Sequence, residues 1–347
     1  MISTSERRPG FALPAVLTVT GVVTLIFVVA ITALASLTAE AASARARIGF
    51  LQRALTLEAT LAHLAATEPF TPRAIAVGSP RNYDDQFVSS PLGGFTSSST
   101  PAEILLDGQT YAADLRGPLA VSLRDQAGMV NLPQMSREQL SGLGGRLGIP
   151  TSARETLRAR LTDYVDTDSL ESTDGAEQAA YGRTGPANRP LLRPSEWLSV
   201  LGVRSAVVPS VWREIRPELA ADQAQGTYNV NTASPVALEI LFNLTPEQAA
   251  RALQSRSRAP FTGMSSLGAA TGAPLGDDGE TLYTFPSGKI VFTVSDGRSP
   301  WVYRGRLTIT PGDAERPVWL DQTEITESPG RRVADTTNAT AFPYTLR

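Results

Sequence analysis

Six carboxylate side chains lie close together in the stretch DYVDTDSLESTDGAE, which covers residues 163–177. No basic residue occurs between Arg160 and Arg183. Like charges this crowded repel one another, so folding them into one loop costs free energy unless a cation neutralises them. Calcium fits such a set because it accepts about six to eight oxygen ligands in irregular geometry, whereas zinc prefers nitrogen and sulfur. The stretch therefore predicts a calcium site.

The spacing of these acids does not match an EF-hand, because a loop starting at Asp166 would place Leu170 where the third acidic ligand belongs. The side chains that we expect to bind calcium are Asp163, Asp166, Asp168, Asp174 and Glu177, with Asn188 as a neutral oxygen ligand. A solvated acidic loop without a metal is the alternative, since runs of charge are usually exposed.

A second informative pattern lies in the stretch RRPGFALPAV, residues 7–16, where two arginines and a glycine precede a long apolar run. From Phe11 to Thr38 no side chain is charged, which exceeds the roughly 20 residues needed to cross a bilayer. A cleaved secretory signal is the alternative, but its apolar region is only about 7 to 15 residues long. The arginines before the run place the N-terminus in the cytoplasm and the chain after residue 40 outside.

The composition limits the classes of function. The chain has 347 residues, 42% of them hydrophobic, which leaves room for two domains beyond the membrane segment. A formal net charge of −3 argues against nucleic acid as a partner. The absence of cysteine excludes disulfides and thiolate metal sites, so any metal must be held by other ligands.

The elements that must position these residues begin with one long helix. Apolar residues keep helical spacing beyond the apolar run, and Pro69 is the first proline after Pro14. We therefore predict a helix over residues 11–68, of which 11–38 would span the membrane. Residues 69–132 are predicted to hold a surface loop, up to Pro101, and then the first strands.

Helical patterns bounded by Ser, Pro and Gly follow, and strands return later in the chain. The expected order is an inserted helical domain over 133–226, a small helical segment of the SAM-like type over 227–270, C-terminal strands over 271–325 and a disordered tail over 326–347. A helical block thus interrupts one antiparallel sheet, and the predicted fold class is α+β.

Several motifs resemble those of a known family. The leader ERRPG, with a cleavage site between Gly10 and Phe11, resembles a class III prepilin signal, in which a peptidase removes residues 1–10 and leaves the apolar helix attached. The segments LTDYVDTDSLESTDGAEQAAYG, RPSEWLSVLGV and YNVNTASPVALEILFNLTPEQAARALQSRSRAPF resemble general secretion pathway protein K, the large minor pseudopilin of bacterial type II secretion. The resemblance implies a pilin-like fold with an inserted helical domain, calcium binding, and N-methylation at Phe11.

The resemblance also implies a function and partners. The expected function is to initiate and cap the tip of the pseudopilus, supporting export of folded proteins across the outer membrane. The expected partners are minor pseudopilins I, J and H, the inner-membrane secretion platform and the prepilin peptidase, with neither nucleic acid nor a small-molecule substrate. A protein of this kind is a single-pass inner-membrane protein with its C-terminal domain in the periplasm. Ala15 stands where most pilins carry a glutamate, and protein K shares this difference.

The sequence also bears on two other classes of function, an enzyme and a DNA-binding protein. An enzyme is disfavoured because the single histidine, His63, excludes an HExxH zinc site and no GxSxG or GxxxxGK[ST] motif is present. A membrane-anchored helix-hairpin-helix DNA-binding protein of a competence or type IV pilus system stays open, since YNVNTA followed by two helices also occurs there. Its hairpin, FNLTPEQ, lacks the glycine that lets the backbone approach a phosphate, and we expect Arg251, Arg256 and Arg258 on a solvated helix face or in a protein contact.

Overall fold

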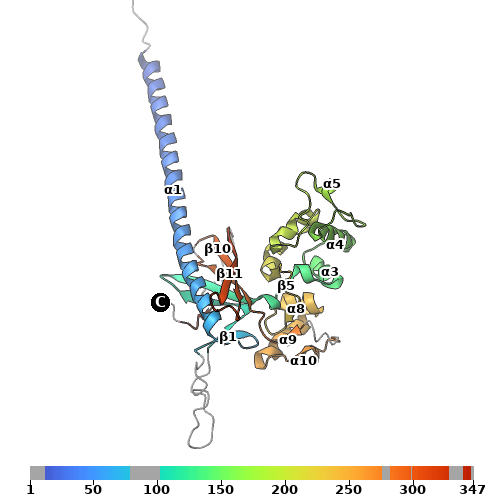
Figure 1. Cartoon of the computed structure of the whole chain (residues 1–347). Helices are drawn as coiled ribbons and strands as arrows, with labels where there is room; N and C mark the ends of the chain where they lie inside the picture. The colour runs from blue at the N-terminus through green and yellow to red at the C-terminus, as the bar shows by residue number, and fades with distance from the viewer. Residues whose placement is uncertain (1–11, 79–101, 276–281, 298, 328–338, 345–347) are drawn as a thin grey trace, which may run out of the picture. The chain divides into compact units, whose positions relative to one another are not determined.

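The computed structural model of the protein describes residues 12–78, 102–275, 282–297, 299–327 and 339–344 (Figure 1). The chain divides into two compact units, one ending at Arg53 and the other comprising Ala54–Arg347. The predicted leader and its cleavage site, Gly10 and Phe11, lie outside the described residues.

Helix α1, Ala12–Thr67, contains 56 residues and runs through both units. Threonine side chains bond back to the carbonyl one turn earlier, as Thr18 does to Pro14 and Thr24 to Thr20, so their hydroxyls need no other partner. The first part of α1 is apolar on all faces and exposed. Among the described residues, α1 is the one helix long and apolar enough to cross a membrane, and an 18-residue window within it has a mean hydropathy of 2.5. The predicted long helix is therefore confirmed.

The last turns of α1 belong to the second unit, where they form part of its core. Leu57, Leu61 and Leu64 recur at helical spacing and are fully buried. Glu58 lies on the same segment and accepts a hydrogen bond from the Tyr303 hydroxyl of the sheet. Burial raises the pKa of the Glu58 carboxyl, and the bond from Tyr303 opposes this shift. This end of the helix is thus fixed to the sheet by packing and by one polar contact.

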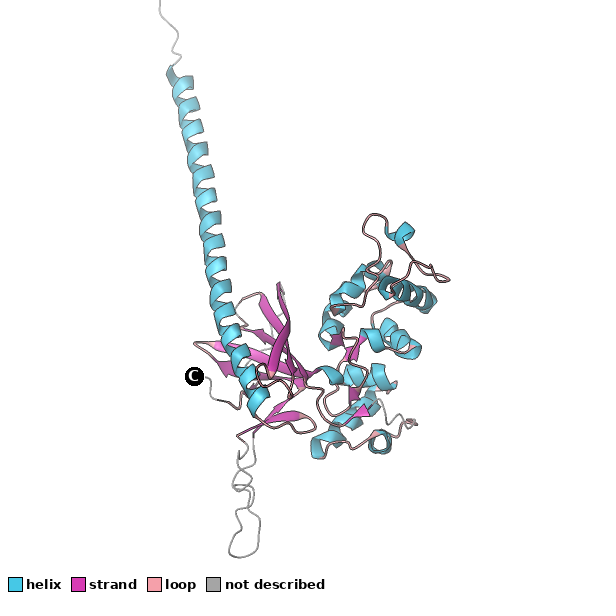
Figure 2. Cartoon of the chain, in the orientation of Figure 1, coloured by secondary structure: helices cyan, strands magenta, loops and turns pink. Residues whose placement is uncertain are grey.

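The main sheet has six strands in the order β11-β10-β9-β4-β3-β12. Figure 2 shows the strands in magenta and the helices in cyan. Neighbouring strands are antiparallel except for β12, which runs parallel to β3. The strands are β3 (Asp107–Asp114), β4 (Pro118–Asp125), β9 (Lys289–Ser295), β10 (Trp301–Ile309), β11 (Val318–Glu327) and β12 (Thr340–Ala341). Along β10 buried and less buried residues alternate, as expected for a strand with one face on the core, whereas most residues of β9 are buried. The predicted α+β class is confirmed.

A smaller antiparallel pair precedes the main sheet. Strand β1 (Ala74–Val77) pairs with β2 (Ala102–Leu105), and all four residues of β1 are buried. The prediction of a surface loop from Pro69 to Pro101 was wrong for β1. Four apolar residues are too few to give a periodic pattern, so the neighbouring Pro, Ser and Gly residues dominated that prediction.

The helical insert leaves the sheet after β4 and returns at β9, and these two strands are paired neighbours. Asp125, the last residue of β4, pairs with Ile290 near the start of β9, so the insert begins and ends at one point of the sheet. Its helices are α3 (Arg137–Arg146), α4 (Thr151–Val165), α5 (Gln178–Tyr181), α6 (Val203–Ala206), α7 (Pro209–Ile215), α8 (Pro235–Phe242), α9 (Pro246–Arg258) and α10 (Met264–Thr271), with the 3-10 helices η1 (Gln126–Gly128), η2 (Leu132–Gln134), η3 (Pro194–Ser199) and η4 (Arg216–Glu218).

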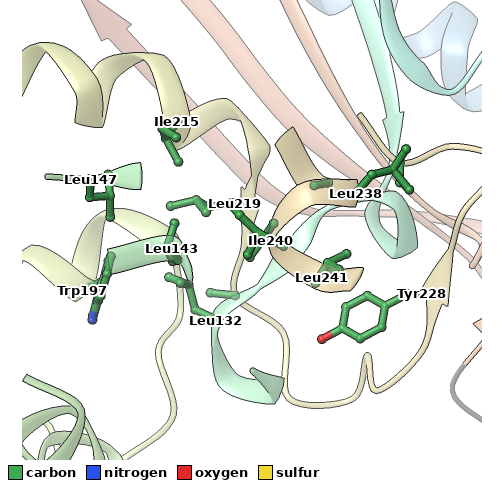
Figure 3. Packing of buried hydrophobic residues seen from close by; sticks show 14 of the residues in the cluster. Leu132, Leu143, Leu147, Trp197, Ile215, Leu219, Tyr228, Leu238, Ile240 and Leu241 are labelled. Atoms are coloured by element: carbon green, nitrogen blue, oxygen red, sulfur yellow. The ribbon is translucent and has the colours of Figure 1, made fainter. Parts of the chain in front are cut away.

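Two short pairs of parallel strands join distant segments of the insert to one another. Strand β5 (Val130–Asn131) pairs with β6 (Leu219–Ala220), and β7 (Tyr228–Asn229) pairs with β8 (Leu282–Tyr283). One hydrophobic cluster runs through the insert from Val130 to Leu267. Figure 3 shows its side chains, among them Leu143, Leu219 and Ile240, facing one another. The segments predicted as 133–226 and 227–270 thus share one core, while their boundary stays a prediction.

The C-terminal strand corrects another expectation. Thr340 and Ala341 pair with Tyr111 and Ala112 of β3, and the Phe342 ring packs edge-on against Tyr111 with the ring centroids 6.1 Å apart. The prediction of a disordered tail over 326–347 was wrong for these residues and for the end of β11. The tail is polar on average, but one buried aromatic and two strand residues suffice to dock it.

Candidate metal centre

The acidic loop joins the end of α4 to the short helix α5. Asp163 lies in the last turn of α4, and Asp166 follows the helix as its C-terminal cap. Glu177 immediately precedes α5 as its N-terminal cap. The loop between them doubles back, which brings Glu177 near Asp166 although eleven positions separate them in the sequence.

Asp163 holds this loop together from the inside. Only 1% of the residue is exposed, and its carboxylate accepts hydrogen bonds from the backbone N–H groups of Ser172 and Ala176, at 3.1 and 2.9 Å, and from the Ser172 hydroxyl. A Cβ atom added at Gly175 would overlap this carboxylate, so the loop needs glycine there. The donors around Asp163 compensate its burial within the protein.

Asp166, Asp168 and Glu177 form a separate group. Each contributes a carboxylate oxygen, and these oxygens lie within 4.8 Å of one another. Asp168 is exposed, Asp166 is half-buried and Glu177 is buried, with 6% of the residue exposed. Three carboxylate oxygens at this spacing could bind a metal ion.

Buried oxygen atoms in this group have no hydrogen-bond donor. They are Asp166 Oδ1, both carboxylate oxygens of Glu177, and Asn188 Oδ1. Asn188 is held in place by bonds from its backbone N–H to the Tyr164 carbonyl, at 3.0 Å, and from its Nδ2 to the Asp168 carbonyl, at 3.2 Å. Buried acceptors without donors cost free energy, and a bound cation would satisfy acceptors of this kind.

The electrostatics of the group agree with this reading. Burial raises the pKa of the Glu177 carboxyl, and the charges of Asp163, Asp166 and Asp168 raise it further. The pKa of Asp166 is raised by burial, then by the charges of Asp168 and Asp163. Both shifts mean that the protein alone disfavours the charged forms, which a bound cation would favour.

The structure thus brings together some of the residues predicted from the sequence and not others. Asp166, Asp168 and Glu177 form the carboxylate group, and the unsatisfied oxygen of Asn188 belongs to the same loop region. Asp163 lies outside the group, with its carboxylate hydrogen-bonded within the loop. Asp174 is exposed and outside it too, in a left-handed backbone conformation with φ of 62°. Their assignment as calcium ligands stays a prediction.

The motif YNVNTA has a structural role within the insert. Asn229 and Asn231 are buried, and Asn231 exchanges two hydrogen bonds with the backbone of Phe261, at 3.0 and 2.7 Å. The N-terminus of α9 is capped by the Thr245 side chain and by Gln248. The backbone N–H groups at the start of α9 and at Phe261 already donate to side chains of this protein. They are therefore poor candidates for phosphate contacts.

The three arginines of α9 lie in different surroundings. Arg251 donates to the Thr271 carbonyl at 2.6 Å. Arg256 is buried, where it donates to the Val230 and Ala233 carbonyls and pairs with Asp107 at 3.3 Å. A solvated helix face, one of the two surroundings expected for these arginines, is therefore wrong for Arg256, while a contact with another protein stays a prediction. Its long side chain bridges the insert to the sheet, which helical spacing alone does not reveal.

A second buried carboxylate, Asp125, was not predicted from the sequence. Asp125, where the insert leaves the sheet, accepts bonds from the side chains of Asn229, Thr232 and Ser287 and from the backbone N–H groups of Ala127 and Ser287. Its partners lie up to 162 positions away, so no local pattern marks it. A lone Asp at a strand end carries no signal that distinguishes it from a turn residue.

The architecture and the site define a class of protein. A long apolar N-terminal helix precedes an α+β body, and a helical insert with a carboxylate group lies between two paired strands of its sheet. This is the arrangement that the motifs predicted for a pilin-like protein with an inserted domain, and the N-terminal helix is long and apolar enough to serve as a membrane anchor.

Comparisons with known proteins support a particular family. Residues 121–221, which contain the whole acidic loop, match the family model for protein K of the type II secretion system. The type II secretion system protein K of Pseudomonas aeruginosa is 29% identical over 161 residues, covering 44% of this chain and 48% of that protein. The chain thus spans about half the length of the curated relative it matches.

The fold is also similar to that of a solved structure. A chain in the crystal structure of the GspK-GspI-GspJ complex from the enterotoxigenic Escherichia coli type II secretion system matches with a TM-score of 0.55 and 18% sequence identity. The match covers 82% of this chain and 99% of that chain. The resemblance to protein K of type II secretion that the motifs predicted is confirmed.

Proposed function

We propose that the protein is a minor pseudopilin of the protein K type, which initiates and caps the tip of a type II secretion pseudopilus and has no catalytic activity. The observation that carries the proposal is the position of residues 121–221, the segment that matches the protein K model. Most of this segment forms an insert in the sheet, and it follows an apolar helix in the sequence. The pseudopilus tip supports export of folded proteins across the outer membrane.

The apolar helix anchors the protein in the inner membrane, with the second unit in the periplasm. Its exposed apolar surface cannot stay in water once the helix leaves the bilayer, so it must pack against helices of partner subunits. A complex of GspK, GspI and GspJ contains a chain of similar fold, which makes minor pseudopilins I and J the expected partners. Pseudopilin H and the inner-membrane platform are further expected partners.

Ala15 supports a position at the tip. It lies exposed in the first turns of α1. A carboxylate here would lie in lipid, at a cost of about 2.5 to 3.5 kcal/mol, unless a neighbouring subunit supplied a partner. A subunit with none above it has no such partner, so an uncharged residue suits the last position of a pilus.

Site-specific cross-linking tests this assembly. The chain has no cysteine, so Ala15→Cys introduces a unique thiol on the apolar helix. With cysteines in the first helical turns of candidate partners, oxidation should capture pseudopilins I and J. Incorporation of the protein uniformly along the pseudopilus shaft would contradict a position at the tip.

Leader processing tests the same proposal independently. The prepilin peptidase should cleave after Gly10, and Phe11 should then carry an N-methyl group. Intact mass of the mature protein checks both expectations. Gly10→Val should block cleavage, because a peptidase selective for glycine has no room for the larger side chain. Cleavage near Ala35 or Ala39, which would release a soluble protein, would contradict the pilin assignment.

Calcium is the proposed metal of the acidic loop. Asp166, Asp168, Glu177 and Asn188 would hold it, since all their contacting atoms are oxygens and some are buried without donors. The ion would stabilise the loop and would supply no chemistry. Asp163 would position the loop from the inside through its hydrogen bonds.

A further inference from the structure

A cavity of about 270 Å³ lies in the second unit, between the sheet and the insert. Arg304 and Arg306 of β10 and Glu324 of β11 line it from the sheet. Arg193, before η3, and Arg216, the first residue of η4, line it from the insert. Residues Tyr303, Gly305 and Leu307 alternate with these two β10 arginines and are buried, so Arg304 and Arg306 lie on the opposite face of the strand.

Two of the four arginines have carboxylate partners. Arg306 makes two parallel bonds to Asp321, at 2.8 and 2.7 Å, and also contacts Asp222 at 3.1 Å. Arg216 pairs with Glu324 at 2.5 Å. Bonds of this kind neutralise the guanidinium groups and fix their positions. These pairs therefore form the walls of the cavity.

Arg304 has no such partner. Among the residues that the structure describes, no carboxylate lies within ion-pair distance of it, and its one hydrogen bond goes to the Leu219 carbonyl at 3.4 Å. Glu324 faces it across the strands, but that carboxylate is bound to Arg216. Burial lowers the pKa of Arg304 to about 10, and the charge of Arg216 contributes. A guanidinium held this way has unused donors that an anion would satisfy.

The rest of the lining limits the kind of anion. Leu219, Ala221 and Val291 contribute apolar surface beside Arg304. Arg193 is exposed, lines the same cavity, and has no ion pair within the described part of the chain. A planar carboxylate matches the fork of a guanidinium, and an apolar body attached to it would cover the apolar wall. A bare inorganic anion would leave that wall unfilled.

We propose that this cavity binds a carboxylate carried on a short apolar group, with Arg304 as its principal charged contact and Arg193 as a second. The C-terminal residue of a polypeptide and a small free carboxylic acid share this chemistry. The site goes beyond the proposed function, because it depends neither on the acidic loop nor on the apolar helix.

Calorimetric titration of the full chain in detergent, with calcium held constant, tests the proposal. The probes are N-acetyl-leucine, which has a terminal carboxylate, and N-acetyl-leucinamide, which has the same body without the charge. A third probe, 4-methylpentanoate, has the carboxylate and the apolar group without the peptide. We expect N-acetyl-leucine to bind at least about tenfold more tightly than its amide. Binding of 4-methylpentanoate as tight as that of N-acetyl-leucine identifies a free acid, and weaker binding identifies a polypeptide terminus.

Variants of the full chain assign the binding to Arg304. Arg304→Met removes the charge at similar length and should weaken N-acetyl-leucine binding by at least about tenfold. Arg304→Lys keeps the charge without the fork, so binding should be weaker than in the wild type even if the Met variant fails to fold. Arg204→Met, at an exposed arginine of α6 outside the cavity, is the matched control. The absence of binding, equal binding of acid and amide, or unchanged binding in a folded Arg304 variant would overturn the proposal.

Discussion

Asp125 and Glu177 are both buried carboxylates, with 1% and 6% of each residue exposed, but their surroundings differ. Five donor groups from four residues surround Asp125, whereas neither oxygen of Glu177 has a donor. The donors around Asp125 oppose the effect of burial, which still raises the pKa of its carboxyl, whereas the carboxylate oxygens of Glu177 make no hydrogen bond. Burial alone therefore does not mark a metal site, and the absence of donors is the more informative feature.

The largest expected effect is the removal of the satisfied carboxylate. Asp125→Ala removes the acceptor that Asn229, Thr232 and Ser287 share in the core and should lower the free energy of unfolding by roughly 3 to 5 kcal/mol. Chemical denaturation of the full chain in detergent measures this. The loss in unfolding free energy should be the same with calcium and with chelator. A loss seen only with calcium would mean that Asp125, like Glu177, depends on the ion, and would contradict the comparison. Glu171→Ala, at an exposed acid, is the matched control.

The next effect concerns the unsatisfied group. Calcium at about one hundred times its dissociation constant should stabilise the wild type by about 2.7 kcal/mol relative to chelator. Asp166→Asn with Glu177→Gln keeps the shapes and removes two charges, so the difference in unfolding midpoint should disappear.

Asp174→Asn tests the ligand set itself. Asn tolerates the left-handed backbone that Asp174 adopts, and Asp174 lies outside the carboxylate group. This variant should keep the calcium-dependent shift, and its loss would place Asp174 among the ligands. An unchanged midpoint in the wild type would mean that the loop holds no structural calcium.

A smaller effect should follow from loosening the loop without touching the carboxylate group. In Gly175→Ala the new Cβ overlaps the Asp163 carboxylate, so the bonds from Ser172 and Ala176 must rearrange at a cost of roughly 1 to 2 kcal/mol. Calcium titration should show weaker binding. Gly226→Ala, where the new atom meets nothing within 4 Å, is the control and should bind normally.

The smallest effect is a dependence on pH. Because the pKa values of Asp166 and Glu177 are raised above their ordinary values of 3.8 and 4.5, the folded state without calcium binds more protons than the unfolded state. With chelator, these groups destabilise the fold as pH rises through the raised values, and acidification removes that penalty.

The stabilisation by calcium should accordingly shrink as pH falls through the same range, because protons compete with the ion. Thermal unfolding at several pH values, with calcium and with chelator, measures both trends. The variant Asp166→Asn with Glu177→Gln should lack them. A calcium effect that grows on acidification would contradict the role given to these two carboxylates.

The sequence predicted what depends on local pattern. The helix Ala12–Thr67 follows from an apolar run and helical spacing, and the acidic loop follows from the density of acids between residues 163 and 177. The helical insert within one sheet was predicted from the order of patterns. These features need no information about which distant residues meet.

What the sequence could not supply is tertiary. Asp163 accepts hydrogen bonds within the loop, whereas the oxygens of Glu177 have no hydrogen-bond donor. This difference depends on how the chain doubles back after α4. The donors around Asp125 come from segments separated by more than a hundred positions. The strands β1 and β12 have too few residues to form a recognisable pattern.

The parallel pairing of β12 with β3 has a consequence for how the protein meets other chains. Of the two borders of the sheet, the one at β3 is covered over Tyr111 and Ala112 by the two residues of β12, while β11 forms the other border of the sheet as described. Backbone groups on an uncovered border can pair with other extended chains. Along β11, Asp321 and Glu324 are held in ion pairs with Arg306 and Arg216, so charged side chains in fixed positions line this border. Pairing between copies is thus opposed at one border by the occupied backbone positions of β3 and at the other by the charged side chains along β11.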